Sequence, residues 1–239
     1  MRLAPPLYRI GNDLVAAYLV VGEGGVTVID AGLPGHWRGL VAELRTLGLT
    51  PADVRGLILT HGDSDHLGFA ERLRRDHGVP VFVHAADAAR ARGEATSHAP
   101  GGSWRLGPSV RFLAYAATRG GLRTRHVREV REVADGDVLD LPGRPRIVGL
   151  PGHSPGSVAV HVPAVDAVFV GDALTTRHVL TGRRGPAPAP FTDDPAAALA
   201  SLERLRGVGA RWVLPGHGTP WDGGTAALVD AVEAVAAGR

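Results

Sequence analysis

The chain has 239 residues, of which 44% are hydrophobic and 21% charged, with a formal net charge of +2. These proportions are typical of a globular protein with a sizeable core. No stretch approaches the roughly 18 apolar residues of a membrane span, and the first residues lack the apolar segment of a secretory signal. We therefore expect one cytoplasmic domain over residues 1–239 that spans no membrane.

Two further features of the composition exclude whole classes of site. The chain contains no cysteine, which rules out disulfides, thiolate metal sites and a cysteine nucleophile. Its near-neutral charge gives no electrostatic reason to expect a nucleic-acid partner. Any metal is therefore expected to be held by imidazole and carboxylate groups.

The first half of the chain alternates predicted strands and helices. Apolar runs at 14–21 and 26–30, separated by GEGG, predict a β-hairpin. Helical spacing, apolar runs and stop signals then predict a helix at 37–48, a strand at 56–60, a helix at 67–77 and a strand at 79–84. Residues 90–108 show no clear period and 113–133 fit a broken helix or a loop, so we expect an irregular or helical insert at about 88–133.

The second half is richer in strands. Strands are predicted at 138–141, 146–150, 158–162 and 167–171, followed by a Pro- and Gly-rich loop at 181–191. Asp194 and Pro195 begin a helix at 195–207, and a strand at 211–215 and a helix at 225–238 end the chain. Strands and helices in both halves, with a β-rich middle, predict two packed sheets covered by helices, in the α/β or α+β class.

The segment HGDSDH, residues 61–66, concentrates four candidate metal ligands directly after a predicted strand. These are His61, Asp63, Asp65 and His66. Where an extended segment turns into a helix, the first two side chains can face one cation and the last two a second. Small residues between them allow the backbone to fold closely around the ions.

Three more candidates follow predicted strands in the same way, in PGHSPGS, GDAL and PGHG. They are His153, Asp172 and His217. Taken singly, each fits an ordinary turn or helix cap. Taken together with HGDSDH, their shared position after strand ends predicts one metal site at the carboxyl edge of the sheets.

These motifs, in this order, resemble those of the metallo-β-lactamase superfamily, and VIDAG at 28–32 resembles that family's first motif. The resemblance covers residues from about 8 to about 220 and implies a four-layer αββα sandwich with two divalent metal ions. It implies that one ion is held by His61, Asp63 and His153. A second would be held by Asp65, His66 and His217, with Asp172 bridging and Asp30 orienting a ligand.

One position departs from the family pattern. Asp63 stands where the family usually has His, as in members with a carboxylate there, including the di-iron flavodiiron proteins. A third carboxylate beside Asp65 and Asp172 adds one negative charge to the site. We expect this charge to favour manganese or iron relative to zinc, although zinc remains compatible with these ligands.

The expected chemistry is hydrolysis of an ester, lactone, thioester or similar bond in a small-molecule substrate. A hydroxide bridging the two metals would attack, because metal binding brings the pKa of water from about 15.7 to about 7. The resemblance assigns catalytic roles to Asp172, Asp65 and Asp30. One alternative is a di-iron oxidoreductase related to the metallo domain of flavodiiron proteins, and another is a metal-bound binding protein without turnover.

Residues outside the motifs are weaker candidates. His126 and His178 are the other histidines placed to reach a substrate, whereas His36, His77, His84, His98 and His161 are expected to serve packing or solvation. The Arg-rich stretch at 119–132 and the loop at 181–191 are expected to shape the substrate rim, since loops around a site set specificity.

Overall fold

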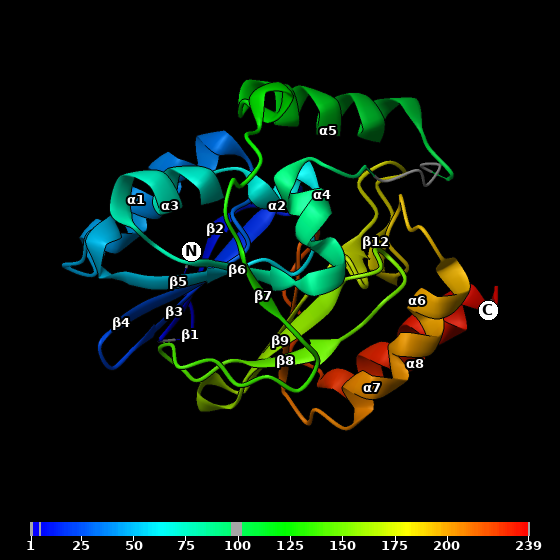
Figure 1. Ribbon diagram of the computed structural model, residues 1–239. Helices are drawn as coiled ribbons and strands as arrows, with labels where there is room; N and C mark the ends of the chain where they lie inside the picture. The colour runs from blue at the N-terminus through cyan, green and yellow to red at the C-terminus, as the bar shows by residue number, and fades with distance from the viewer. Residues whose placement is uncertain (1, 5, 97–101, 239) are drawn as a thin grey trace.

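The computed structural model describes residues 2–4, 6–96 and 102–238 and contains two main β-sheets (Figure 1). The seven-stranded sheet follows chain order: β1 (Arg2–Ala4), β2 (Leu7–Gly11), β3 (Ala16–Gly22), β4 (Gly25–Ile29), β5 (Val54–Ile58), β6 (Val81–His84) and β7 (Arg131–Val133). Strands β1 to β4 pair antiparallel, and β4 to β7 pair parallel.

The second sheet has the order β13-β10-β9-β8. Its strands are β8 (Arg146–Gly149), β9 (Val158–Val162), β10 (Ala167–Gly171) and β13 (Trp212–Pro215). Strand β13 lies parallel to β10, and β9 pairs antiparallel with both β8 and β10. A separate small pair is formed by β11 (Thr175–Arg177) and β12 (Arg184–Ala187).

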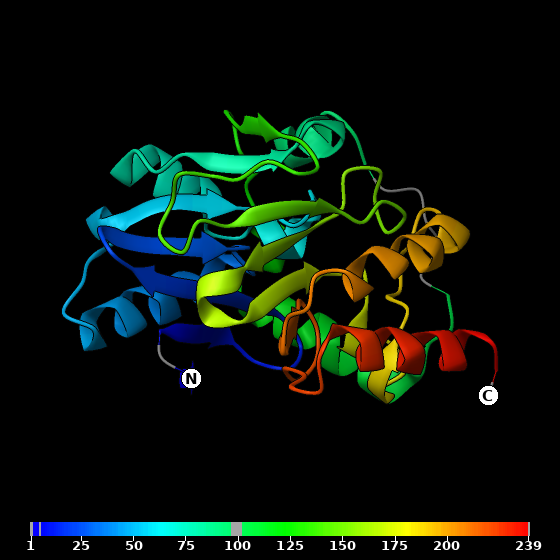
Figure 2. The ribbon, with the colours of Figure 1, turned by 90° about the horizontal axis from the view of Figure 1, so that it is seen from below.

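Helices cover the outer face of each sheet (Figures 1 and 2). Helices α1 (Trp37–Thr46) and α3 (Ala70–His77) pack on the first sheet, and α6 (Pro195–Ser201), α7 (Glu203–Arg206) and α8 (Thr225–Ala236) pack on the second. Helices α2 (Ser64–Leu67), α4 (Ala88–Arg92) and α5 (Leu106–Thr118) lie at one edge. Short 3-10 turns are η1 (Pro34–His36), η2 (Pro51–Asp53), η3 (Ala85–Asp87), η4 (Gly121–Arg123) and η5 (Pro163–Val165).

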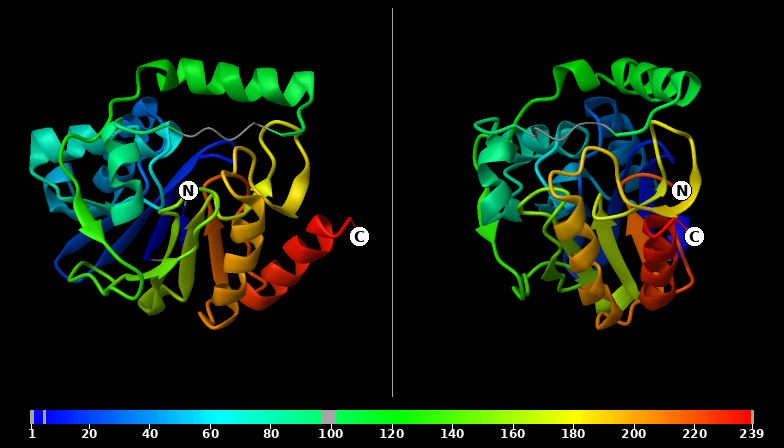
Figure 3. Two further views of the ribbon diagram at one scale, coloured as in Figure 1. Left: turned by 45° about the vertical axis from the view of Figure 1, so that its right-hand side comes forward. Right: turned by 90° about the vertical axis from the view of Figure 1, so that its right-hand side faces the viewer.

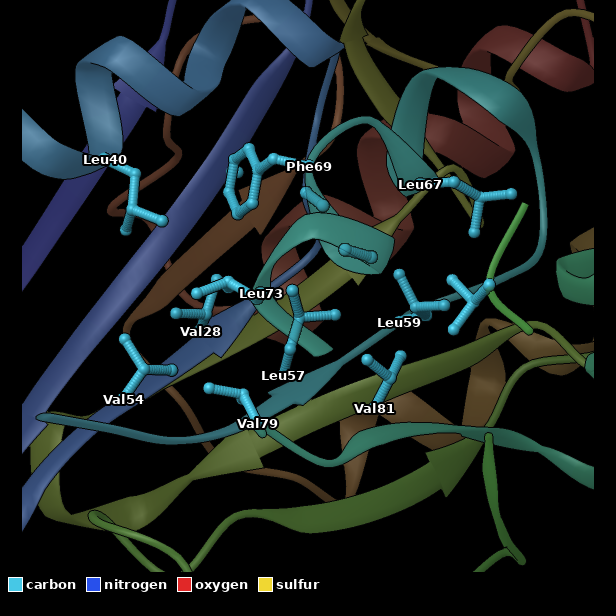
Figure 4. Packing of buried hydrophobic residues seen from close by; sticks show 14 of the residues in the cluster. Val28, Leu40, Val54, Leu57, Leu59, Leu67, Phe69, Leu73, Val79 and Val81 are labelled. Atoms are coloured by element: carbon cyan, nitrogen blue, oxygen red, sulfur yellow. The ribbon is translucent and has the colours of Figure 1, made fainter. Parts of the chain in front are cut away.

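Three hydrophobic layers hold the sandwich together. Alternate residues of a strand point to opposite faces, so β3 sends Leu19 to the helical side and Tyr18 to the space between the sheets. There Tyr18 packs against Phe169 of the second sheet, with ring centroids 5.3 Å apart. Figure 4 shows the helical side, where Leu40 and Phe69 pack above the first sheet. The fold is the expected αββα sandwich.

Several sequence expectations are corrected at the level of single elements. The helix expected at 67–77 is divided, because Gly68 approaches the backbone of Gly32 so closely that a Cβ would lie 2.3 Å from its oxygen. The strand expected at 138–141 is reduced to one bridge, between Val138 and Arg146. The loop expected at 181–191 contains β12.

The region expected to be an insert at 88–133 contains more regular structure than its sequence indicated. It supplies α4, the thirteen-residue helix α5, the turn η4 and strand β7. Part of the loop expected at 90–108, with His98, falls on residues 97–101, outside the described residues. None of the described helices combines the length and apolar character needed to cross a membrane.

Candidate metal centre

The candidate ligands meet because the strands that precede them end at one edge of the sandwich. Strands β4 and β5 run parallel and lead to Asp30 and to residues 61–66. In the second sheet β8, β10 and β13 all run in the same direction, and they lead to His153, Asp172 and His217. Parallel strands present their carboxyl ends at the same side, so the topology gathers these side chains.

The first group of candidate ligands consists of His61, Asp63 and His153. The Oδ2 atom of Asp63 lies 3.8 Å from His61 Nε2 and 3.4 Å from His153 Nε2. One atom from each side chain falls within 4.8 Å of the others, a spacing that suits three ligands around one cation. This is the set that the sequence predicted for one ion.

The second group consists of Asp65, His66 and His217, whose candidate ligand atoms also lie within 4.8 Å of one another. Asp172 lies between the groups. Its Oδ2 is 3.1 Å from His217 Nε2 and 4.0 Å from His153 Nε2, and its Oδ1 is 3.5 Å from His66 Nε2. The structure therefore brings together all seven residues singled out from the sequence, with Asp172 where a bridging carboxylate would stand.

The tautomers of His61 and His66 follow from their hydrogen-bond partners. The Asp30 carboxylate only accepts, so Nδ1–H of His66 donates to Asp30 Oδ2 at 2.9 Å. The Thr60 hydroxyl gives its one proton to Asp30, at 2.9 Å, and so accepts from Nδ1–H of His61 at 3.1 Å. In their neutral forms both rings therefore present an unprotonated Nε2 to the cluster.

The same reasoning applies to the other two histidines. The Thr192 hydroxyl donates to the Ala189 carbonyl at 2.9 Å and accepts from Nδ1–H of His153 at 3.3 Å. Nδ1–H of His217 donates to the carbonyl of Leu14. A hydrogen bond to the outer ring nitrogen is the arrangement that orients metal-binding histidines in proteins.

The inner atoms of this cluster show that a metal fits. The Nε2 atoms of His61, His66 and His153 and the Oδ1 atom of Asp172 are buried, and they make no hydrogen bond to any residue that the structure describes. A buried polar atom without a partner is costly. Four such atoms converging on one point form a donor set that a divalent cation would satisfy, and imidazole and carboxylate suit zinc, iron or manganese.

The charges within the cluster are strongly coupled. Burial and the neighbouring His66 and His153 lower the pKa of His61 well below its usual value. Burial alone would also lower the pKa of His66, but the Asp30 and Asp172 carboxylates raise it well above its usual value. Burial would raise the pKa of Asp63, but His153, His61 and Arg90 together lower it. The cluster therefore holds an ionised Asp63 beside a neutral His61, whereas the carboxylates around His66 favour its protonated form, and a cation bound at Nε2 would replace that proton.

Two backbone features support the cluster. Asp30 adopts a left-handed conformation, with φ of 58°, which turns its carboxylate toward Thr60 and His66. Gly216 leaves room for the ligands, because a Cβ at that position would lie 2.5 Å from His66 Cε1 and 2.7 Å from Asp172 Oδ1. Both residues act through the side chains that they position.

The sequence analysis missed two supporting side chains on the segment after β6. Buried Asp87 accepts from the backbone N–H of Gly62 and Gly156, each at 2.8 Å, and from the Ser154 hydroxyl at 2.7 Å, so it ties together two ligand-bearing loops. Arg90 donates to Asp63 Oδ1 at 3.1 Å. Neither residue belongs to a recognisable motif, and only their place after a strand end hinted at the site.

A cavity of about 480 Å³ opens onto the cluster. Asp63, Asp65, His153, Asp172 and His217 line one side of it. The opposite wall is apolar and includes Phe112, Leu113, Ala116, Leu122 and Phe191. Helix α5 supplies three of these residues and lies above the edge of the sandwich in both orientations (Figures 1 and 3).

The weaker sequence candidates divide between two cavities. His126 lines the cavity at the cluster, together with Gly121 and Leu122 from the Arg-rich stretch. His178 lines a neighbouring cavity instead.

Comparisons with known proteins agree with this geometry. Residues 10–217 match the family model described as the metallo-beta-lactamase superfamily. The chain is 29% identical over 206 residues to the probable metallo-hydrolase YflN of Bacillus subtilis (strain 168), covering 82% of this chain and 76% of that protein. It is 34% identical over 180 residues to the acyl-coenzyme A thioesterase MBLAC2 of Gallus gallus, covering 70% of this chain and 60% of that protein.

A solved structure of TTHA1623 in a di-iron-bound form is similar along nearly the whole chain. It shows 28% sequence identity and a TM-score of 0.63, covering 94% of this chain and 97% of that chain. The family match spans all the motifs from Asp30 to His217, and the fold and the ordered ligand set agree with it. The chain therefore belongs to the metallo-β-lactamase superfamily.

Proposed function

We propose that this chain is a metal-dependent hydrolase that cleaves an ester or thioester bond in a small molecule with an apolar acyl group. The observation that carries the proposal is the cavity of about 480 Å³, which has five of the seven candidate ligands on one side and an apolar wall on the other. Its volume lies within the range typical of small-molecule sites, roughly 300–1,000 Å³. The relative named as an acyl-coenzyme A thioesterase supports the choice of acyl substrates.

The proposed function assigns each candidate ligand to one ion or to both. One ion would be held by His61, Asp63 and His153. The other ion would be held by Asp65, His66 and His217, and Asp172 would contact both ions. When bound, two divalent ions make an attacking water more acidic and stabilise negative charge on the substrate oxygen. Phe112 and Leu113 of the apolar wall would contact the acyl group and exclude bulk water from the scissile bond.

The reaction forms a bond between the oxygen of water and the acyl carbon and breaks the carbon–oxygen or carbon–sulfur bond. The leaving group needs a proton. Asp65 is better placed than Asp172 to take a proton from the attacking water and pass it to the leaving group, because the Asp65 side chain is 22% exposed and the Asp172 side chain 7%. Asp30 does not line the cavity and would act only by orienting His66.

The test measures kcat/KM for ester and thioester substrates from acetyl to dodecanoyl, with protein reloaded with zinc, manganese or iron. We expect kcat/KM to rise with acyl length. Phe112→Ala should lower it about tenfold for long chains, because burying such a side chain is worth roughly 1.5–3 kcal/mol. The matched control is Leu106→Ala, on the same helix, 70% exposed and outside the cavity lining.

Two outcomes would count against the proposal. No cleavage of any ester or thioester by metal-loaded protein would refute hydrolysis of these bonds. Equal kcat/KM for acetyl and dodecanoyl substrates would refute the role given to the apolar wall.

A redox function is the second candidate. It is favoured by the likeness to TTHA1623, which was solved in a di-iron-bound form, and by the carboxylate at Asp63. Iron-loaded protein would then show visible absorption that bleaches on reduction and would consume oxygen when given a reductant. Absence of both signals in iron-loaded protein that hydrolyses esters would decide for the first candidate.

A further inference from the structure

The two carboxylate oxygens of Asp63 have different neighbours. Oδ2 faces His61 and His153 within the first group of candidate ligands. Oδ1 accepts a hydrogen bond from Arg90 Nη1 at 3.1 Å. The arginine therefore occupies one oxygen of this carboxylate and leaves the other for a cation.

Arg90 is itself held on both sides. It lies on α4 and its side chain is only 9% exposed. Its second terminal nitrogen, Nη2, donates to Asp193, whose backbone N–H in turn donates to the His153 carbonyl at 3.1 Å. Gly62 leaves the space for this side chain, since a Cβ there would lie 2.9 Å from Arg90 Cβ and Cγ. The guanidinium thus has one well-defined position against Asp63.

The pair changes the charge expected from the sequence. A carboxylate in place of imidazole adds one negative charge to the cluster, and the guanidinium beside it offsets part of that charge. The offset is partial because the other end of the same guanidinium pairs with Asp193. A carboxylate that offers one oxygen, with its charge partly offset, resembles a single imidazole nitrogen more than a chelating carboxylate.

We propose that Arg90 is a positioning residue that sets the metal preference of the His61–Asp63–His153 group. By holding Oδ1 and offsetting part of its charge, it makes Asp63 a one-oxygen ligand and keeps the site suited to zinc. Without Arg90, both oxygens of Asp63 are free to bind and the offsetting positive charge is lost. Oxygen-rich, negatively charged sites favour harder ions such as manganese.

The test compares zinc and manganese affinities by competition with a chromophoric chelator, without any activity assay. In Arg90→Met, we expect the ratio of zinc to manganese affinity to fall about tenfold or more, the range typical when a partner of a ligand is removed. Arg90→Gln keeps a donor without the charge and should shift the ratio in the same direction. The matched control is Arg92→Met, on the same helix, where Arg92 pairs with Glu94.

A double variant identifies the route of the effect. If Arg90 acts through Asp63, the double variant Asp63→His/Arg90→Met should have the same ratio of zinc to manganese affinity as Asp63→His alone. The proposal is overturned if the ratio in Arg90→Met and Arg90→Gln equals that of the unaltered chain, or if Arg90→Met shifts it equally in the Asp63→His background. The inference rests on the proposed metal centre, which fails separately if the unaltered chain takes up neither metal.

Discussion

Asp30 provides the sharpest test of how the cluster is oriented. Its carboxylate is 3% exposed and accepts from Thr60 N–H at 2.8 Å and from Nδ1–H of His66 at 2.9 Å. Asp30→Asn preserves the shape and the acceptor for Thr60, and Asn tolerates the left-handed backbone that this position requires. The amide places a donor against His66, so His66 loses its acceptor and the proton moves toward Nε2, the atom that would bind metal.

The magnitude follows from the lost hydrogen bond. A hydrogen bond to a charged group contributes about 1.5–3 kcal/mol, and about 1.4 kcal/mol corresponds to a tenfold change in an equilibrium constant. We therefore expect Asp30→Asn to weaken metal binding by roughly 10- to 150-fold. The metal-free protein should still fold, with its free energy of unfolding lowered by about 1–3 kcal/mol.

Chelator competition gives the metal affinity, and urea unfolding of the metal-free chain gives the stability. Asp135→Asn is the matched control, because Asp135 also accepts from a backbone N–H, that of Gly149 at 2.8 Å, but lies outside the cluster. It should leave the metal affinity unchanged. Asp30→Asn protein that folds and binds zinc as tightly as the unaltered chain would show that Asp30 does not orient His66.

Three further results are expected. Asp172→Ala should reduce the metal content of reloaded protein, measured by elemental analysis, from two ions to one or fewer, because its two oxygens face different groups. Gly216→Ala should displace His66 and lower both metal content and the free energy of unfolding, the latter by about 1–3 kcal/mol.

The third result concerns the pH dependence of stability. Burial and Arg119 lower the pKa of His36 from 6.5 to about 4. As the pH falls from 6.5 to about 4, His36 is therefore protonated in the unfolded chain but not in the folded one. Over this window the free energy of unfolding should fall by about 3 kcal/mol because of His36. Urea unfolding against pH should show this slope in the unaltered chain and a smaller one in His36→Asn, and equal slopes would contradict it.

The site could be anticipated from the sequence because the candidate ligands lie shortly after strand ends or, for Asp65 and His66, in the short helix α2 that follows β5. His61, His153 and His217 are far apart in the chain, but parallel strand directions gather their ends at one edge. Each predicted strand and the His or Asp residue that follows it are close together in the sequence, so the pattern that indicates the site can be recognised in short segments. The four layers could be anticipated for the same reason, since strand and helix periodicities are local properties.

What the sequence did not reveal depends on contacts between distant residues. Arg90 meets Asp63 across 27 positions, and nothing near Arg90 in the chain marks it as different from the other arginines. Strand β12 escaped detection because RGPA lacks the apolar alternation of a strand and pairs only with the short strand β11. Helix α5 escaped because its apolar residues are not confined to a buried face.

Helix α5 is held by hydrogen bonds near both of its ends. Near its start, Arg105 N–H and the Ser109 hydroxyl both donate to the Leu180 carbonyl. Near its end, Nε2 of His36 lies 2.8 Å from the Tyr115 hydroxyl, and Arg119 accepts from Gly35 N–H. All thirteen residues of the helix are described, and none of them is buried.

The cavity wall formed by α5 and the candidate metal ligands therefore lie on separate parts of the chain, and α5 can be substituted without changing the ligands. Substitutions on the exposed length of α5 remove little buried surface, so their effect on stability should be within about 0.5 kcal/mol. They would nevertheless alter the cavity wall opposite the candidate ligands. New substrates could thus be accommodated by substitutions in this one helix that leave Asp30, Asp172 and the four histidines of the cluster unchanged.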